Sequence, residues 1–248
     1  FFLRIQPNHV YINQSGIEFG MIYSKIAQKL HIPFSLWMHN PEYYRNIVNG
    51  GLVRKLFSMM RDFLADALLV NKKVNIIAVS EFTKNKLIKR GFVPKQIKVI
   101  NNLLPTFDYE LCDQILIDQL EEIAQKSKIV ATVGRIQYSD KGQDQIIEAA
   151  KIILQQDPKI HFIFFGDGPD ANDLKEKIKN EDLNENFLFL EWVPDAHLYF
   201  KFCDLVLVPS RFETLSLVGI EAISQDVKIV ASDIPALCYV HEYNRFKL

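Results

Sequence analysis

Short apolar segments that alternate with longer helical patterns constrain the fold of this chain more than any other feature. Four of them lie in the first part of the sequence and five in the second, at residues 9–13, 33–39, 74–80, 97–101, 128–134, 159–166, 186–192, 204–210 and 228–232. The later five are nearly continuous apolar runs, which are typical of strands buried on both faces of a sheet. The alternation predicts an α/β fold with parallel sheets covered by helices.

A break in this alternation separates the two groups of strands. Pro105 interrupts the chain, and residues 106–127 then show a polar helical pattern without a strand, so we expect a linker that contains a helix. The sequence therefore predicts two Rossmann-like, doubly wound parallel-sheet domains, at residues 1–105 and 128–248. The first has four expected strands and no glycine-rich opening turn, so we expect it to be incomplete.

Charge is divided unevenly between these two parts. The 248 residues have a formal net charge of −1, but residues 1–108 contain 15 Lys and Arg against 6 Asp and Glu, a charge of +9, and the remainder carries −10. A basic first part is suited to an anionic partner surface. The three cysteines have no paired spacing, which argues against a disulfide framework or a structural zinc site and favours the cytoplasm. No apolar run reaches the roughly 18–20 residues needed to cross a bilayer.

Two cations follow the first strand expected in the second domain. Arg135 comes directly after Gly134 at the carboxyl end of that strand, where open α/β sheets bind ligands, and Lys141 follows in the same loop. A guanidinium fork and an ammonium point charge are suited to a pyrophosphate. Taken alone, the same residues are also typical of solvated loop cations.

Two glutamates flank the start of a helix in the same domain. Glu213 follows a buried strand and precedes a helix expected to begin near Ser216, and Glu221 lies inside that helix. Backbone amides at a helix N-terminus bind anions, whereas carboxylates accept hydrogen bonds from pairs of hydroxyls. This layout matches a ligand with a diol, a diphosphate and a second diol in sequence, which describes a nucleotide-diphosphate sugar.

The motifs VGR…KG, FGDGP, DLVLVPSRFETLSLVGIEA and VKIVASDIPAL together resemble family 4 of the retaining glycosyltransferases, which have the GT-B architecture. The resemblance covers nearly the whole chain, and the E-x7-E signature of the family falls on Glu213 and Glu221. It implies transfer of a sugar, with retention of anomeric configuration, from a nucleotide-diphosphate-sugar donor to a glycan or lipid-linked acceptor. It also implies a fragment truncated at both ends, since the family's opening glycine-rich turn and C-terminal helices are missing.

The resemblance implies roles for individual residues. The donor diphosphate would be bound by side chains and backbone amides of Arg135, Lys141, Leu215, Ser216 and Leu217. Glu221 would bind the ribose, and Glu213 would contact the transferred sugar as a catalytic residue. His39, at the end of a first-domain strand, would face that sugar as a second catalytic residue, although a histidine at a strand end is often a structural hydrogen-bonding group. Three glycines either let the backbone approach the ligand or form tight turns: Gly134, Gly166 and Gly168.

The sequence contains no Asp-x-Asp pair of the kind that holds a metal-diphosphate. We therefore expect no metal ion or other cofactor, because Arg135 and Lys141 can neutralise the diphosphate instead. One departure from the family concerns Asp226, which stands where a glycine commonly ends the donor-domain helix. Asp adopts the left-handed conformation more readily than most residues, so we expect this change to be mild.

A basic and apolar helical stretch in the first domain suggests contact with an anionic membrane. Four cations and four large apolar residues are interleaved in it: Arg45, Arg54, Lys55, Arg61, Phe57, Met59, Met60 and Phe63. Such a stretch can lie on anionic lipid at the inner face of the membrane, or its apolar side can pack on its own sheet. No nucleic-acid-binding motif accompanies the charge, so a nucleic-acid partner is not expected.

Two other functions stay open from the sequence. Residues 166–171 fit the G-x-G-x-x-A pattern after a strand, and Glu191 ends the following strand, as in an NAD-type dinucleotide-binding oxidoreductase or epimerase. That pattern belongs after the first strand of its sheet, however, and another strand precedes it here. The other alternative is a catalytically inactive, glycosyltransferase-like chain that serves as a binding subunit.

Overall fold

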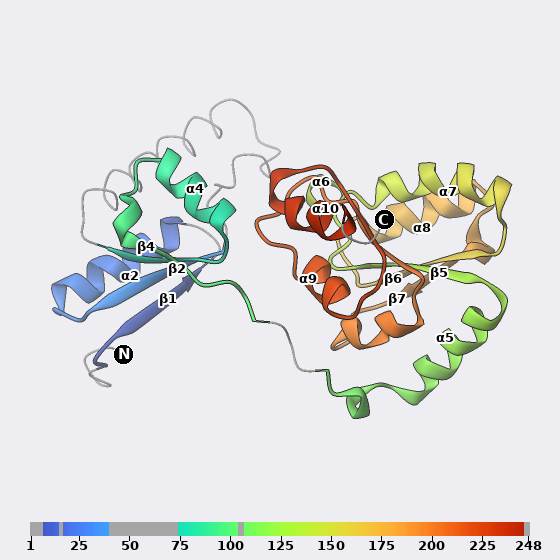
Figure 1. The fold of residues 1–248 in the computed structure, drawn as a ribbon, viewed down its shortest axis with the longest axis horizontal. Coiled ribbons are helices and arrows are strands. Elements are labelled where there is room, and N and C mark those ends of the chain that lie inside the picture. The colour runs from blue at the N-terminus through green and yellow to red at the C-terminus, as the bar shows by residue number, and fades with distance from the viewer. Residues whose placement is uncertain (1–6, 15–16, 40–73, 104–106, 246–248) are drawn as a thin grey trace. The chain divides into compact units, whose positions relative to one another are not determined.

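The chain forms two compact units, Phe1–Asn102 and Leu103–Leu248, each with its own parallel sheet (Figure 1). The computed structural model describes residues 7–14, 17–39, 74–103 and 107–245. The basic stretch at residues 45–63 lies outside these described residues, so its contact with a membrane stays a prediction. Within the described part, no helix has the length and apolarity needed to span a membrane.

The sheet of the first unit has four parallel strands in the order β1-β2-β3-β4. These strands are β1 (Val10–Gln14), β2 (Phe34–Met38), β3 (Asn75–Ala78) and β4 (Ile97–Val99). The helix α2 (Ile17–Lys29) connects β1 to β2, and α4 (Glu81–Lys89) lies between β3 and β4, followed by a 3₁₀ turn (Pro94–Gln96). Helix α4 begins after Ser80, whose Oγ accepts a hydrogen bond from the amide of Thr83 at 3.1 Å.

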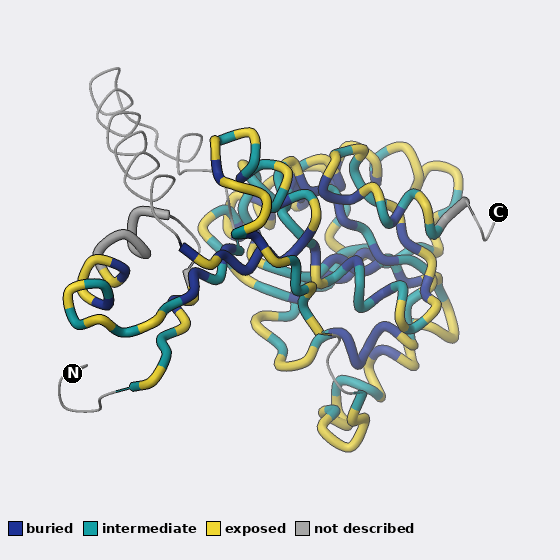
Figure 2. The backbone as a smooth tube through the Cα atoms, turned by 60° about the vertical axis from the view of Figure 1, so that its left-hand side comes forward, coloured by how far each residue is buried: buried dark blue, intermediate teal, exposed yellow. Residues whose placement is uncertain are grey.

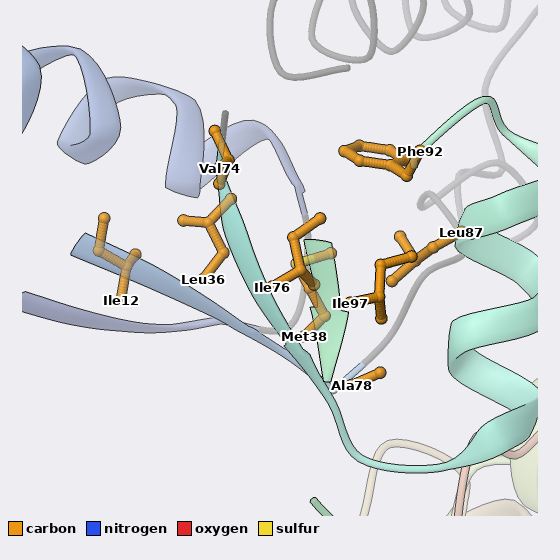
Figure 3. Close-up of a cluster of buried hydrophobic side chains, with 9 residues drawn as sticks. All are labelled: Ile12, Leu36, Met38, Val74, Ile76, Ala78, Leu87, Phe92 and Ile97. Atoms are coloured by element: carbon orange, nitrogen blue, oxygen red, sulfur yellow. The ribbon is translucent and has the colours of Figure 1, made fainter. Parts of the chain in front are cut away.

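Alternate residues of these strands build the core of the first unit, because successive side chains on a strand point to opposite faces of the sheet. Figure 3 shows the buried cluster that results: Ile12, Leu36, Met38, Val74, Ile76, Ala78, Leu87, Phe92 and Ile97. Leu87 comes from α4, and Phe92 comes from the turn after it. This helix therefore covers the face of the sheet that carries the cluster.

The sheet of the second unit has five parallel strands in the order β7-β6-β5-β8-β9. These strands are β5 (Lys128–Val133), β6 (Ile160–Phe165), β7 (Phe187–Leu190), β8 (Leu205–Val208) and β9 (Ile229–Ala231). The chain runs outward from β5 to β7 and then returns to begin β8 on the other side of β5. This reversal places a topological switch point between β5 and β8. All nine segments predicted to be strands contain one.

Helices cover both faces of this second sheet (Figure 1). One face packs against α7 (Asp144–Gln156) and α8 (Ala171–Asn180). The other face packs against α5 (Gln114–Lys126), the 3₁₀ segment Ala196–Phe202, α9 (Leu217–Ser224) and α10 (Cys238–Arg245). Figure 2 colours the chain by burial, and buried residues, in dark blue, occur in β5, β6, β8 and β9, whereas those of β7 are of intermediate burial. The arrangement confirms the doubly wound fold predicted for the second domain.

The helix predicted within the linker, α5, is part of the second unit. Its Leu120 is fully buried beside Ile129 of β5 and Ile163 of β6. The amide of Asp113, just before α5, donates a hydrogen bond to Tyr199 Oη at 2.8 Å. Four short elements complete the unit: Tyr109–Leu111, α6 (Tyr138–Lys141), Asn184–Asn186 and Pro235–Leu237.

Candidate functional site

The loops that follow β5 and β8 meet at the switch point of the second sheet. The first loop, residues 134–143, contains the short helix α6, and the second, residues 209–216, leads into α9. A pocket at this edge is lined by the ends of β5 and β8 and by polar residues of the loops: Lys141, Gln143, Ser210, Glu213 and Ser216. Open α/β sheets bind their ligands at this position, outside the carboxyl ends of the strands.

A close ion pair joins the two loops. Lys141 Nζ donates to Glu213 Oε1 at 2.6 Å, and Ser210 Oγ donates to the same oxygen at 3.0 Å. The Glu213 side chain is 10% exposed and that of Lys141 is 30% exposed, so the carboxylate is the more deeply placed partner. The family resemblance implies that Lys141 binds the donor diphosphate and that Glu213 contacts the transferred sugar, and both roles stay predictions.

A glycine allows the two loops to approach so closely. Gly142 ends α6 in the left-handed conformation, at a φ of 67°. A Cβ atom there would lie 2.2 Å from the carbonyl oxygen of Pro209 in the other loop, which no side chain can accommodate. The Gly142 position thus brings the backbone of the KG element directly against the β8 loop.

The loop after β5 is held in shape by a buried glutamine that the sequence did not single out. Gln143 Nε2 donates to the carbonyl oxygen of Arg135 at 2.9 Å, and its Oε1 accepts from the amide of Gln137 at 3.2 Å. The guanidinium of Arg135 lies at the surface, 63% exposed, with Asp140 at 3.9 Å. Arg135 therefore stands in the predicted loop but outside the Lys141–Glu213 contact, and its role toward the diphosphate stays a prediction.

Two of the three glycines that the sequence offered either for ligand approach or for tight turns face the backbone of a neighbouring loop. Gly166 has a φ of 142°, and a Cβ there would lie 2.3 Å from the carbonyl oxygen of Gly134. A Cβ on Gly168 would lie 2.2 Å from the carbonyl oxygen of Ile136. These contacts favour the tight-turn interpretation for both. Gly134 differs, because nothing lies within 4 Å of a Cβ placed there, although its amide already donates to the carbonyl oxygen of Phe165 at 2.9 Å.

Helix α9 begins at Leu217, directly after Ser216, as the sequence predicted. Ser216 Oγ accepts a hydrogen bond from the amide of Gly219 at 3.3 Å, and its carbonyl oxygen accepts one from Tyr239 Oη at 2.8 Å. The first amides of a helix have no carbonyl partner within it, so this terminus can receive an anion. Tyr239 anchors the terminus and was not foreseen from the sequence.

Glu221 lies in the second turn of α9, whereas Glu213 lies in the loop before the helix. Burial raises the pKa of the Glu221 carboxyl, and Asp195 adds to the rise, while nearby His197 acts in the opposite direction. His197 is itself buried. The two glutamates of the E-x7-E signature therefore occupy different surroundings, one paired with a lysine and the other half-buried beside a histidine.

His39 belongs to the first unit and follows β2 directly. Its ring is stacked with that of Trp37, at a centroid distance of 6.3 Å and an interplanar angle of 5°. Burial lowers the pKa of its imidazole. The role of His39 toward a donor sugar stays a prediction.

No cluster of three or more His, Cys, Asp or Glu side chains suited to a metal ion occurs in the described part of the chain. Independence from metal stays a prediction from the sequence.

Residues 113–244, more than half of the chain, match the family described as Glycosyl transferases group 1. The chain belongs to this family. The match contains every proposed donor-site residue, from Gly134 to Glu221.

Curated relatives extend the similarity across most of the chain. Alpha-monoglucosyldiacylglycerol synthase of Streptococcus pneumoniae is 26% identical over 240 residues, which cover 90% of this chain and 52% of that protein. The N-acetylgalactosamine-N,N'-diacetylbacillosaminyl-diphospho-undecaprenol 4-alpha-N-acetylgalactosaminyltransferase of Campylobacter jejuni is 28% identical over 229 residues, 92% of this chain and 55% of that protein. The chain thus spans about half the length of these relatives.

Solved structures confirm the predicted GT-B fold with two Rossmann-like domains. HepE of Anabaena, in complex with UDP-glucose, superimposes with a TM-score of 0.72 at 22% identity, covering 94% of this chain and 61% of that one. WaaG, a glycosyltransferase involved in lipopolysaccharide biosynthesis, gives a TM-score of 0.68 at 15% identity, covering 90% and 66%.

Proposed function

We propose that the chain provides the donor site and an acceptor-side domain of a retaining glycosyltransferase that uses a nucleotide-diphosphate sugar. The observation that carries this proposal is the Lys141–Glu213 contact at the switch point of the second sheet. A cation, a carboxylate and a helix N-terminus lie together there, which are the groups that a sugar diphosphate requires.

The proposed reaction combines the charges at this site with the retention of configuration that the family resemblance implies. The bond between the anomeric carbon and the diphosphate oxygen breaks, while the acceptor hydroxyl oxygen bonds to the same carbon from the same face. The hydroxyl proton passes to the leaving phosphate, and a nucleoside diphosphate departs. Lys141, Arg135 and the first amides of α9 stabilise the charge that grows on the leaving group. Glu213 orients the sugar hydroxyls, and Glu221 binds the ribose.

The acceptor proposed for this chain is lipid-linked or a glycan. Both curated relatives described above carry a lipid in their names, a diacylglycerol in one and a diphospho-undecaprenol in the other. The basic first part of the sequence suits such an acceptor at an anionic membrane surface.

The NAD-type alternative loses its main support in the fold. Its glycine-rich turn follows β6, the second strand of the sheet rather than the first. Gly166 and Gly168 are also explained by their packing against the loop after β5. No specific observation therefore favours dinucleotide binding.

A thermal-shift panel on the full chain tests the donor proposal. UDP, GDP, ADP and their sugars are compared with NAD, and we expect stabilisation by at least one nucleoside diphosphate and none by NAD. Stabilisation by NAD alone would overturn the assignment. Transfer of labelled sugar by the protein, abolished by Glu213→Ala, then distinguishes an enzyme from an inactive binding subunit. Transfer that persists in EDTA supports independence from metal, and a strict requirement for Mg²⁺ or Mn²⁺ contradicts it.

A further inference from the structure

Arg211 ties the loop after β8 to the loop after β5 through both its side chain and its backbone. Its guanidinium meets the Asp144 carboxylate with two parallel hydrogen bonds, Nη1 to Oδ1 at 2.5 Å and Nη2 to Oδ2 at 2.8 Å. Nη1 also donates to the carbonyl oxygen of Tyr138 at 2.6 Å. The guanidinium therefore contacts both ends of the segment 138–144, which contains Lys141.

The backbone of the same residue sets the register between the two loops. The amides of Arg211 and Phe212 both donate to the carbonyl oxygen of Asp140, at 2.8 and 3.0 Å. Asp140 immediately precedes Lys141, and Phe212 immediately precedes Glu213. Lys141 and Glu213 thus each follow directly after a residue of this backbone contact between Asp140 and Phe212.

The charges agree with the geometry. Hydrogen bonds from Arg211 hold the pKa of the Asp144 carboxyl below its usual range, and Asp144 raises the pKa of the guanidinium in return. The two side chains are 42% and 31% exposed, so water competes for the pair but does not surround it. A bidentate pair of this kind adds directional specificity that a lysine cannot reproduce.

We propose that Arg211 is a positioning residue for the donor site, acting through Asp144 and the segment 138–144 to hold Lys141 against Glu213. The inference rests on the proposed function, because it assigns to Lys141 and Glu213 the binding of the donor. The guanidinium of Arg211 donates its hydrogen bonds to Asp144 and Tyr138 rather than to either partner of the ion pair. It restricts the relative motion of the two loops, so that the ammonium and the carboxylate face a ligand in one arrangement.

The hydrogen bonds from Arg211 to Asp144 and to the carbonyl oxygen of Tyr138 are called the clamp below. Hydrogen–deuterium exchange on the full chain without ligand tests the clamp independently of any donor. We expect Arg211→Ala and Asp144→Ala each to accelerate exchange at least about threefold in both loops, residues 134–145 and 209–217, and the double variant to add nothing. The matched control is Lys151→Ala, which removes a cation that pairs with Glu181 at 2.8 Å between α7 and the end of α8. Acceleration confined to residues 209–217, or equal acceleration in the control, overturns the clamp.

Titration with UDP then separates positioning from general loss of structure. We expect Arg211→Ala to weaken UDP binding about tenfold, and Arg211→Lys to restore only part of it because a lysine lacks the fork. In a Lys141→Met background the same Arg211→Ala change should cost no further affinity, since the group that it positions is gone. Independent, additive losses overturn the positioning role.

The positioning role and the proposed donor site can still be tested separately if a variant does not fold or if no nucleotide binds. Where Arg211→Ala does not fold, Asp144→Asn removes the charge at the other end of the pair and should give the same exchange pattern. If the wild-type chain binds none of UDP, GDP and ADP, the proposed donor site is contradicted and the positioning role with it, while the exchange data still decide whether the clamp exists.

Discussion

Replacing Lys141 with methionine should destabilise the second unit because it leaves a shielded carboxylate without its cation. The ammonium lies 2.6 Å from Glu213 Oε1, and the glutamate side chain is only 10% exposed. A hydrogen bond to a charged group contributes about 1.5–3 kcal/mol, and water can replace little of it at this depth. We therefore expect Lys141→Met to lower the free energy of unfolding by about 2 kcal/mol, or the Tm by about 4–8 °C for a unit of roughly 150 residues.

The burial of the two partners predicts an asymmetry between the single variants. Glu213→Gln removes the more buried charge and leaves Lys141, which is 30% exposed, free to reach water. It should therefore cost less stability than Lys141→Met. The measurements are calorimetry and urea denaturation of the full chain, with the two single variants and the double variant forming a cycle.

The matched control is the pair formed by Lys126 and Glu122 on α5. Its N···O distance is 2.7 Å, nearly the same, but the side chains are 68% and 70% exposed. Lys126→Met should therefore leave the melting temperature unchanged. If Lys141→Met also melts like the wild type, or if Glu213→Gln is the more costly change, the reasoning from burial is wrong.

Three further outcomes follow from individual contacts. Burial raises the pKa of Glu221, so the folded state binds its proton more tightly than the unfolded state, and stability should fall as the pH rises from about 4.5. Glu221→Gln should remove this slope, which denaturation midpoints measured from about pH 4 to 8 would show. Gly166→Ala should lower the free energy of unfolding, measured by urea denaturation, by at least about 3 kcal/mol, because strain at positive φ adds to a backbone clash. Gly134→Ala introduces the strain alone and should lower it by about 1–2 kcal/mol. Arg211 lowers the pKa of Asp144, so their pair should stabilise the fold above about pH 4 and lose its effect on acidification, and Asp144→Asn should flatten the acid limb of stability against pH.

Elements whose signal is local were predicted correctly from the sequence. The nine strands follow from apolar runs, and the start of α9 follows from Ser216, whose side chain caps the helix. Asp226 also behaves as expected, since it adopts the left-handed conformation at a φ of 61°. The linker interpretation was less informative, because the amphipathic pattern of α5 does not show on which sheet its apolar side packs.

The contacts that make the site depend on the order of strands in the sheet. Four side chains make the hydrogen bonds that hold the two loops: Arg211, Asp144, Gln143 and Tyr239. Nothing in the sequence near the glycine and glutamate motifs distinguishes them from other polar residues. A weak signal for Arg211 existed, because it is a cation two residues before Glu213 in a loop between a buried strand and a helix.

The sequence by itself determined which segments form strands and helices, the presence of two α/β domains, and the residue types available for a sugar diphosphate. It did so because hydrophobic periodicity, helix caps and motif spacing are properties of neighbouring residues. Only the tertiary structure decided that Lys141 forms an ion pair with Glu213 and that Arg211 forms one with Asp144. Residues so far apart in the chain come together because β8 pairs with β5, and this strand order depends on how the whole sheet packs.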